Sequence, residues 1–475
     1  MENTKLVSLL ALIALPAVVA AACGDSGTGG TNASSGTGTG GGAGSGVGGE
    51  FVGSVGSGGA PASSSSGAGG NTLDAGLEDF CMGKGAIPIP GATECTGDIG
   101  KKTFLFAACS CTGFDASNTI LTDSFSSSVD PNKPLAGGSI GVNGNYSAQA
   151  AASIKGALLV KGSMSTANQH DVVQDMQCGG DATISHPALA QSNATIGGTI
   201  GSNNKELTIN GKLFTPIADN ANKVNALGGA VVGPVDIETP CNCDDQVNIA
   251  GIVGAFAGTN DNDENGVAPD VLVANPSMPT EITLPCGRYS LTGIKSDSTV
   301  TVHLTGRTVL AVDGDVAVAG KLTIDLAPEA ELDLFVKGNV SLTNQAAIGA
   351  TERPAATRVY IGGSQVTLAG SFVLGANLYM PNAALQANNA LEIFGAVFAK
   401  SITTAHQLEI HYDEAILTID GCQPPDSACK DCHDCVNPTP ACGPGGKCGP
   451  CTTNKDCCPP LICTANGACV LPPPK

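Results

Sequence analysis

The chain has 475 residues, a formal net charge of -20 and only 13% charged residues, with 64 Gly and 20 Cys. A strongly negative chain repels phosphate, which excludes nucleic acid and an anionic membrane surface as electrostatic partners. Neutral polysaccharide or a basic protein partner stays compatible with this charge. The glycine and cysteine content indicates that much of the chain is not ordinary globular core.

Residues 1–22 have the pattern of a secretory signal, with Lys5 followed by a short apolar run that contains Pro16. The junction Ala20-Ala21-Ala22-Cys23 resembles the bacterial lipobox, which implies a lipid on Cys23 and cleavage of the signal at the bond just before it. Asp25 does not directly follow the cysteine, so the resemblance implies an outer-membrane lipoprotein or a cell-surface location. The alternative is an ordinary cleavage site with an incidental thiol at Cys23.

Residues 23–72 consist mostly of Gly, Ser, Thr and Ala. Such a segment has too few apolar side chains to form a core, and it predicts a disordered tether. A flexible chain of this length has a mean reach on the order of 40 Å. A lipid followed by this tether would hold the rest of the protein away from a surface.

Within residues 73–240 a short phrase repeats from Val142 onward: an apolar residue, any residue, Gly and a small polar residue. Gly144, Gly162, Gly180 and Gly198 stand 18 residues apart, and a shorter step leads to Gly211. Polarity alternates around each glycine, as in a strand with one buried face. The repeat predicts a Cys-stapled section of parallel β-helix, with three short strands per coil and Gly or Asn supplying positive φ at the corners. The short step indicates a deleted side or a misalignment.

A second series follows in residues 241–420, anchored at Val312, Val336, Ile361, Met380 and Ala399. These anchors are 24, 25, 19 and 19 residues apart. Coils of this length suit a parallel β-helix whose interior is filled by Val, Ile and Leu. The absence of Trp fits a narrow interior. The predicted fold class is therefore all-β, a β-solenoid in two sections.

Several phrases of the second series resemble an uncharacterised solenoid domain found in surface lipoproteins of gliding soil bacteria and in adhesin-like proteins associated with type IV pilus assembly. They are Leu284–Tyr289, Glu331–Val336, Val359–Gly363, Leu378–Ala383 and His411–Asp413. The resemblance covers about residues 240–418 and implies a β-solenoid with no established activity. The first series is similar, in period only, to the triangular solenoid of bactofilin-type filament formers.

Residues 421–475 hold 11 of the 20 cysteines and no apolar run long enough for a core. Such a tail needs cross-links to be stable, and its spacing is similar to knottin and Dickkopf-type modules. Behind a secretory signal we expect disulfides, although Cys429, Cys432, His433 and Cys435 also match a zinc set, and Cys429 to His433 matches the haem-attachment string. The disulfide candidates are Cys81, Cys95, Cys109, Cys111, Cys178, Cys241, Cys243, Cys286, Cys422, Cys429, Cys432, Cys435, Cys442, Cys448, Cys451, Cys457, Cys458, Cys463 and Cys469.

An odd number of cysteines, 19, remains once Cys23 is set aside. If Cys422 pairs within the tail, one thiol is left in the tail and none in the solenoid. An unpaired thiol in an oxidising compartment is reactive or pairs between chains. The count therefore predicts a dimer linked by a disulfide between tails.

The stretch Asp261-Asn262-Asp263-Glu264-Asn265-Gly266 matches the first half of a calcium-binding loop. Leu272 stands at the twelfth position, where a bidentate Glu is usual. We predict a weak calcium site at Asp261, Asp263 and Asn265, with a polar loop that binds nothing as the alternative. No other cofactor is expected.

Polysaccharide-cleaving β-helices line one outer sheet with carboxylates and basic residues from successive coils. The candidates for such a set here are Asp313, Asp315, Asp325, Asp333 and Arg307. Alternating Asp along a strand is more typical of its solvated face. We expect His411-Tyr412-Asp413 to cap the exposed end of the last coil rather than to transfer protons.

The sequence favours a non-catalytic cell-surface lipoprotein that presents a β-solenoid for adhesion or surface-layer structure. Its expected partners are the membrane, through the lipid at Cys23, and a surface polysaccharide or another surface protein. The alternative is a carbohydrate-active β-helix protein that binds or cleaves polysaccharide. Carboxylates clustered in one groove across adjacent coils would favour that alternative.

Overall fold

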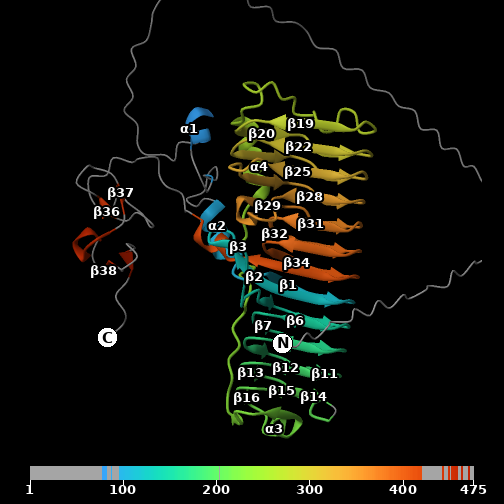
Figure 1. The fold of residues 1–475 in the computed structure, drawn as a ribbon, viewed down its shortest axis with the longest axis vertical. Coiled ribbons are helices and arrows are strands. Elements are labelled where there is room, and N and C mark those ends of the chain that lie inside the picture. Colours follow the sequence, from blue (N-terminus) through green and yellow to red (C-terminus); the bar gives the residue numbers. More distant parts are fainter. Residues whose placement is uncertain are drawn as a thin grey trace, which may run out of the picture. The chain divides into compact units, whose positions relative to one another are not determined.

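The computed structural model describes residues 77–82, 87, 96–202, 204–419, 441–442, 448–449, 451–457, 462–463 and 469–470. All of them belong to the second of two compact units, residues 69–475. Most described residues form a parallel β-solenoid, and the predicted fold class is confirmed (Figure 1). The residues predicted as signal peptide, lipidated Cys23 and tether lie outside the described part of the chain.

From β4 onward, the coils of the N-terminal section contain three-residue or four-residue strands, as the 18-residue period predicted. One coil consists of β7 (Leu158–Val160), β8 (Met164–Thr166) and β9 (His170–Val172), and the next of β10 (Met176–Cys178), β11 (Ala182–Ile184) and β12 (Ala188–Ala190). Met176 pairs with Leu158, and Ala182 with Met164, each 18 residues earlier. The first and third residue of each strand point into the core. The remaining elements are β4 (Ile140–Val142), β5 (Asn145–Ala148), β6 (Ala152–Ile154), β13 (Ala194–Ile196), β14 (Ile200–Ser202), β15 (Leu207–Ile209), β16 (Leu213–Thr215), α3 (Asn220–Lys223), β17 (Val224–Ala226) and β18 (Ala230–Val232).

The corner glycines are needed for close approach, and the prediction that Gly144, Gly162, Gly180 and Gly198 adopt positive φ was wrong. None of the four is in the left-handed region. A Cβ on Gly198 would come 2.5 Å from the backbone carbon of Gly180 in the preceding coil. The coils stack too closely at this corner for any side chain. Gly198 lies between β13 and β14, whereas Gly211 lies two corners later, between β15 and β16, so the short step was a misalignment.

The C-terminal section has longer strands and larger coils. Its strands are β19 (Thr280–Leu284), β20 (Gly287–Leu291), β21 (Ile294–Ser296), β22 (Val300–Leu304), β23 (Thr308–Val312), β24 (Val316–Val318), β25 (Leu322–Leu326), β26 (Leu332–Val336), β27 (Val340–Leu342), β28 (Ala346–Gly349), β29 (Thr357–Ile361), β30 (Gln365–Leu368), β31 (Phe372–Gly375), β32 (Asn377–Ala387), β33 (Leu391–Phe394), β34 (Val397–Thr404) and β35 (Leu408–Asp413). Strands β23, β26 and β29 are buried along their whole length. Their inward Val, Ile and Leu fill the core, and their outward residues are covered by other segments.

The two sections are not stacked in the order in which they follow one another in the sequence. The first coil of the N-terminal section stacks on the last coil of the C-terminal section. The first strands of the solenoid, β1 (Ala108–Ala116) and β2 (Ile120–Ser126), pair in parallel with β34 and β35 of its last coil on one side. On the other side β1 pairs with β4 and β5, and β2 with β6. The chain thus enters and leaves the solenoid near the middle of the stack (Figure 1).

This order corrects the expected role of His411-Tyr412-Asp413. We expected the triplet to cap an exposed sheet end, but β35 is paired with β33 on one edge and with β2 on the other. The expectation was wrong because the last coil in sequence is an interior coil in space. Asp413 instead ties local chain segments together, accepting hydrogen bonds from Ser127 and from the backbone of Ala415.

The chain returns from β18 to β19 through residues 233–279, which we call the return segment. It runs along the outside of the solenoid (Figure 1), and two disulfides, Cys109 to Cys241 and Cys111 to Cys243, fix it to β1. It then forms α4 (Ile249–Gly258), whose buried face packs on β20, β23 and β26. The short helices α1 (Leu77–Met82) and α2 (Thr96–Thr103) also lie against this section, and Cys81 of α1 is bonded to Cys286.

Smaller elements complete the described chain. Strand β3 (Asp130–Leu135) forms an antiparallel hairpin with β2. The 3₁₀ helices η1 (Pro354–Ala356) and η2 (Glu414–Thr418) flank the C-terminal section. In the cysteine-rich tail, β36 (Ala441–Cys442) pairs with β37 (Cys448–Gly449), and β38 (Ile462–Cys463) pairs with β39 (Cys469–Val470). The tail also contains η4 (Asn454–Asp456) and a Cys451 to Cys463 disulfide.

Candidate functional site

The outer face of the 14-stranded sheet carries the clearest candidate site. Apart from β3, which pairs with β2, this sheet has one strand from each coil, running from β19 through β35 and β2 to β17. Alternate residues of each strand point outward, so side chains from successive coils form rows across the strands. A ligand on this face would meet a repeating set of groups at the spacing of neighbouring strands, about 4.8 Å.

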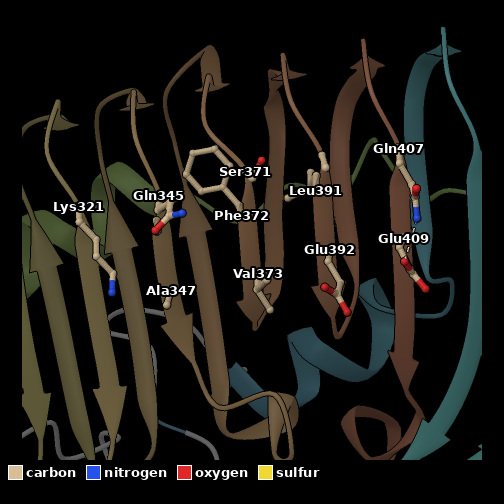
Figure 2. Close-up of a pocket in the computed structure, with 12 residues that line it drawn as sticks. Lys321, Gln345, Ala347, Ser371, Phe372, Val373, Leu391, Glu392, Gln407 and Glu409 are labelled. Atoms are coloured by element: carbon tan, nitrogen blue, oxygen red, sulfur yellow. Dashed lines mark hydrogen bonds between the residues drawn. The ribbon is translucent and has the colours of Figure 1, made fainter. Parts of the chain in front are cut away.

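A hollow with a cavity volume of about 470 Å³ lies on this face between β25 and β35. Figure 2 shows Lys321 and Gln345 on one side and Glu392 and Glu409 on the other, with Val373 between them. Val373 is 43% exposed, which is unusual for a large apolar side chain in a strand. The hollow therefore combines an apolar floor with amide, ammonium and carboxylate groups at its margins.

A second hollow of about 170 Å³ adjoins the first and shares Glu409 with it. It extends from β35 across the junction between the sections to β2 and β6, and it is lined by Asp123, Ser153, Lys155 and His411. Together the two hollows span consecutive coils from β25 to β6. We call this surface the junction groove.

His411 stands in the junction groove among three carboxylates. Its Nδ1 is 2.7 Å from the Asp123 carboxylate, and its Nε2 is 3.5 Å from Glu409 and 3.6 Å from Glu392. The ring of Phe394 stacks on the imidazole with centroids 4.5 Å apart. The hydrogen bond to Asp123 raises the pKa of His411, against the opposing effect of burial, and the charges of Asp123, Glu409 and Glu392 add to it.

A second histidine repeats this arrangement nearer one end of the same face. His303 on β22 lies 2.7 Å from Asp325 on β25 and 3.2 Å from Glu281 on β19. The hydrogen bonds to Asp325 and Glu281 raise the pKa of His303. Unlike His411, this histidine lies beside neither hollow.

A family model described as a domain of unknown function, DUF7305, matches residues 242–419. The chain is similar to that domain over the return segment from Asn242 onward and the C-terminal section. The match includes His411, Glu392 and Glu409 but ends short of Asp123, which lies in the N-terminal section. No curated protein and no solved structure matches the chain.

Sequence reasoning missed Asp123, Glu392 and Glu409. A local signal existed for two of them, because Leu391-Glu392-Ile393-Phe394 and Leu408-Glu409-Ile410-His411 repeat one pattern in neighbouring coils. No such signal marks Asp123, which is 288 residues from His411 and reaches it only through the pairing of β2 with β35. The expectation that His411 does not transfer protons was therefore made without its three neighbouring carboxylates.

The acidic residues proposed from the sequence as a polysaccharide-cleaving set do not come together. Asp313 forms an exposed ion pair with Lys337, and Asp325 pairs with His303. Asp315 accepts a hydrogen bond from the backbone of Asn339 in the next coil, where it stabilises a corner.

Asp333 and Arg307 also lie apart from the junction groove, beneath other segments. The carboxylate of Asp333 is fully buried and binds the equally buried guanidinium of Arg358, with Nη2 2.7 Å away. Arg307 stacks over the ring of Phe80, with Cζ 4.9 Å from its centroid. These two residues stabilise the covered face of the C-terminal section.

The residues predicted to bind calcium form a cap on β20. The Asp261 carboxylate receives two hydrogen bonds from the Arg288 guanidinium, at 2.9 and 2.8 Å, and one from the Arg288 backbone at 2.8 Å. Asn265 donates to the backbone oxygen of Asp261, and Asp263 accepts from Gly266 through its backbone. A carboxylate held in this way by arginine is engaged on both oxygens, which favours the polar-loop alternative.

Three of the disulfide pairs connect the solenoid to its covering segments, whereas Cys178 is a free thiol buried in β10. Its inclusion among the disulfide candidates was wrong, because its side chain points into the core and its Sγ contacts backbone oxygens such as that of Gly162, 3.4 Å away. The location of the odd thiol was also wrong, since a free thiol does lie in the solenoid. The disulfide candidates outside the described residues are Cys95, Cys422, Cys429, Cys432, Cys435 and Cys458.

The zinc and haem alternatives concern Cys429 to Cys435, which lie outside the described part of the chain. Within the described tail, Cys451, Cys457 and Cys463 have their sulfurs within 4.8 Å of one another. Cys451 and Cys463 form a disulfide and Cys457 is also disulfide-bonded, so this grouping is not a thiolate metal site. No helix among the described residues is long and apolar enough to span a membrane.

Proposed function

We propose that this protein is a non-catalytic cell-surface lipoprotein that presents its β-solenoid for adhesion and holds an extended polysaccharide along the junction groove. The observation that supports this most is the continuity of the two hollows across consecutive coils through Glu409. A compact metabolite needs an enclosed pocket, whereas an open groove that crosses parallel strands matches a chain-like ligand.

The chemistry of the groove supports a saccharide chain. Gln345, Gln407, Glu392 and Glu409 offer donors and acceptors at the margins, and Val373 offers an apolar surface for the C–H face of a sugar ring. Neighbouring strands are about 4.8 Å apart, close to the length of one hexopyranose unit in an extended chain. A repeating saccharide would thus meet comparable groups on each coil.

Co-sedimentation of the purified protein with a panel of insoluble and immobilised polysaccharides tests the proposal. We expect Glu409→Gln combined with Val373→Lys to reduce binding to a retained polysaccharide by about tenfold or more, because both substitutions alter the groove. Asp313→Asn is the matched control, since Asp313 is an exposed acid outside the groove. Equal binding by the groove variant and the wild type would contradict the proposal.

The lipid anchor at Cys23 is part of the proposal and has a separate test. The basis is the apolar run that ends in Ala20-Ala21-Ala22-Cys23. Detergent phase partitioning should place the wild-type protein in the detergent phase and Cys23→Ser in the aqueous phase. Equal aqueous recovery of both proteins would contradict the lipoprotein assignment and leave the groove unaffected.

A polysaccharide-cleaving activity is the second candidate, and the cluster around His411 favours it. Glu392 and Glu409 approach one imidazole nitrogen from adjacent coils, and Asp123 holds the other nitrogen. Pairs of carboxylates are the usual acid and base groups of glycoside hydrolysis. The test is the release of reducing ends from a bound polysaccharide. If the wild type releases them and Glu392→Gln and Glu409→Gln do not, the function is catalytic and not adhesive.

A further inference from the structure

The two ends of the solenoid differ in how their outermost strands are finished. At the β20 end, residues of the return segment line the outer edge of β20 and β21, whereas β19 pairs only with β22 among the described strands. The backbone nitrogen of Asp261 donates to the Arg288 oxygen at 2.7 Å, and the Asn262 side chain both donates to and accepts from the Ser290 backbone, at 2.9 Å each. Farther along the same edge, the oxygens of Pro269, Leu272 and Pro276 accept from backbone nitrogens of Thr292, Lys295 and Asp297.

At the opposite end the outermost strands are β17 and β18. Strand β17 pairs with β15, and β18 pairs with β16. Within the described chain, neither strand forms a ladder along its other edge. Helix α3 caps a neighbouring strand instead, because Asn220 accepts from the Ile200 backbone and donates to the Gly198 oxygen. The edge of β18 is therefore open, and an open parallel edge is a template for another strand.

The side chains of this open end are apolar and exposed. Leu227 is 66% exposed, Val231 45% and Val232 52%. All three residues of β18 are exposed, whereas both inward positions of β16 and of β13 are buried. A cluster of this kind on an edge strand indicates a docking surface, since monomeric proteins generally protect such edges.

The charge distribution favours a second copy of this chain as the occupant. Residues 224–233 contain no charged residue, although the chain has a net charge of -20. Two copies can therefore approach through this coil without bringing like charges together. The opposite end is acidic, with Asp261, Asp263, Glu264 and Asp270 in its cap, so a second copy is repelled there.

We infer that two copies of this protein dock through their open ends, with β18 of one copy pairing antiparallel with β18 of the other. A two-fold axis perpendicular to the strands makes this contact self-complementary and places Val231 near Val231 of the second copy. Each copy uses the same β18 edge in this contact, so the contact closes on itself as a dimer and does not extend into a filament. The face is one coil wide, so we expect a dissociation constant of about micromolar order.

Cysteine cross-linking on the full chain tests the inference. Val231→Cys should give a covalent dimer on oxidation in excess of the wild type, and Met278→Cys, an exposed residue of the return segment, should not. Mass spectrometry of the cross-linked peptides identifies the partner of Cys at position 231. A link to residues 1–76 of the same chain, or to a different protein, would overturn the inference.

Sedimentation velocity in reducing conditions gives the second measurement. The wild type should dimerise, and Leu227→Lys with Val231→Lys should raise the dissociation constant by about tenfold or more, because four lysines then face one another in the dimer. Val373→Lys, on the groove face, should leave the dimer unchanged. An unchanged unfolding midpoint verifies that the double variant folds. A wild type that is monomeric after reduction would overturn the inference, including the case of a dimer linked only by disulfides.

Discussion

The two sections of the solenoid share one stack of coils but reach stability in different ways. In the N-terminal section, short strands repeat every 18 residues with Ala, Ile, Val and Leu inside, and most of the outer surface is open to solvent. In the C-terminal section, the outward residues of β23, β26 and β29 are covered by the return segment and α1, α2 and α4. Repetition alone suffices for small coils, whereas larger coils require an added layer.

The added layer makes a second core outside the coils. Phe256 of α4 begins a run of aromatic rings that continues through Phe335, Tyr360, Tyr379 and Phe398 on successive strands, with centroid distances of 4.8 to 6.0 Å. Beside this run, Arg358 is fully buried against Asp333. The N-terminal section has a smaller aromatic group, Phe114 and Tyr146 with His170, and it lies inside the coils.

The largest loss of stability is expected when the buried ion pair of the C-terminal section is broken. Asp333→Ala leaves the Arg358 guanidinium buried without its main partner, and such changes cost about 3 to 5 kcal/mol of unfolding free energy. Denaturant unfolding of the full chain measures this loss. Asp313→Ala, which removes an exposed pair with Lys337, should leave the midpoint nearly unchanged. Equal effects of the two substitutions would contradict the importance of the covering layer.

The disulfides between the layer and the coils should give the next largest effect. The double variant Cys109→Ala, Cys241→Ala removes a cross-link between residues 132 apart in sequence, and loss of a native disulfide typically costs about 2 to 5 kcal/mol. Cys178→Ala is the control for the loss of a buried sulfur without a cross-link, because that thiol is free, and it should cost less than the double variant. Unfolding in urea, with thiols counted by alkylation, measures both. No loss of stability in the double variant would show that the return segment does not need this anchor.

Truncations of single core side chains should cause smaller losses of stability, and the loss should be larger in the aromatic layer than inside the N-terminal coils. Phe335→Leu removes ring contacts with Phe256 and Tyr360 in the covering layer, and we expect a loss of about 1 to 3 kcal/mol. Ile196→Val inside an N-terminal coil removes one methyl group and should cost about 0.5 to 1.5 kcal/mol. Thermal unfolding followed by circular dichroism provides the measurement. The reverse order would indicate that the aromatic layer packs loosely.

The smallest effects concern pH and have opposite signs in the two sections. His411 has a raised pKa, so its contribution to stability is present below the unfolded pKa, about 6.5, and is lost as pH rises through the folded pKa. His170 is buried beside Tyr146 and its pKa is lowered, so its contribution is present above about 6.5 and declines as pH falls toward the folded pKa. NMR titration of the imidazoles, compared with His411→Gln and His170→Gln, measures both directions. A folded-state pKa of His411 below that of His170 would contradict these assignments.

The repeat within each coil was predictable because its cause is local. A strand with one buried face alternates in polarity, and the 18-residue spacing of Gly144, Gly162, Gly180 and Gly198 follows from one tight corner per coil. The reason for those glycines was not predictable from one chain segment, since the obstructing atoms belong to the preceding coil. The sequence pattern alone does not distinguish a glycine with positive φ from one with a close neighbour.

The order of the coils and the site at their junction could not be predicted in the same way. The polarity pattern of β1 would be satisfied by stacking on any coil, so nothing in it specifies β34, which follows almost 300 residues later. Asp123 lies beside His411 only because the first coil of the chain stacks on the last one, which pairs β2 with β35. By contrast, the stretch from Asp261 to Gly266 was predicted as a calcium loop, but side chains that fit a cation also fit the free edge of a strand, as Asp261 and Asn262 do.

The disulfide between Cys81 and Cys286 determines how the protein bears mechanical tension. If the chain is pulled from the residues before Cys81 and from those after residue 419, the shortest covalent path crosses this disulfide and continues through the C-terminal section. The N-terminal section lies within the bypassed covalent loop, whose ends are 205 residues apart in sequence. The covalent path through the described disulfides therefore bypasses its strands as long as the Cys81 to Cys286 bond is intact. The coils without a covering layer are the mechanically shielded ones, and the tension falls on the coils stabilised by Asp333, Arg358 and the aromatic layer.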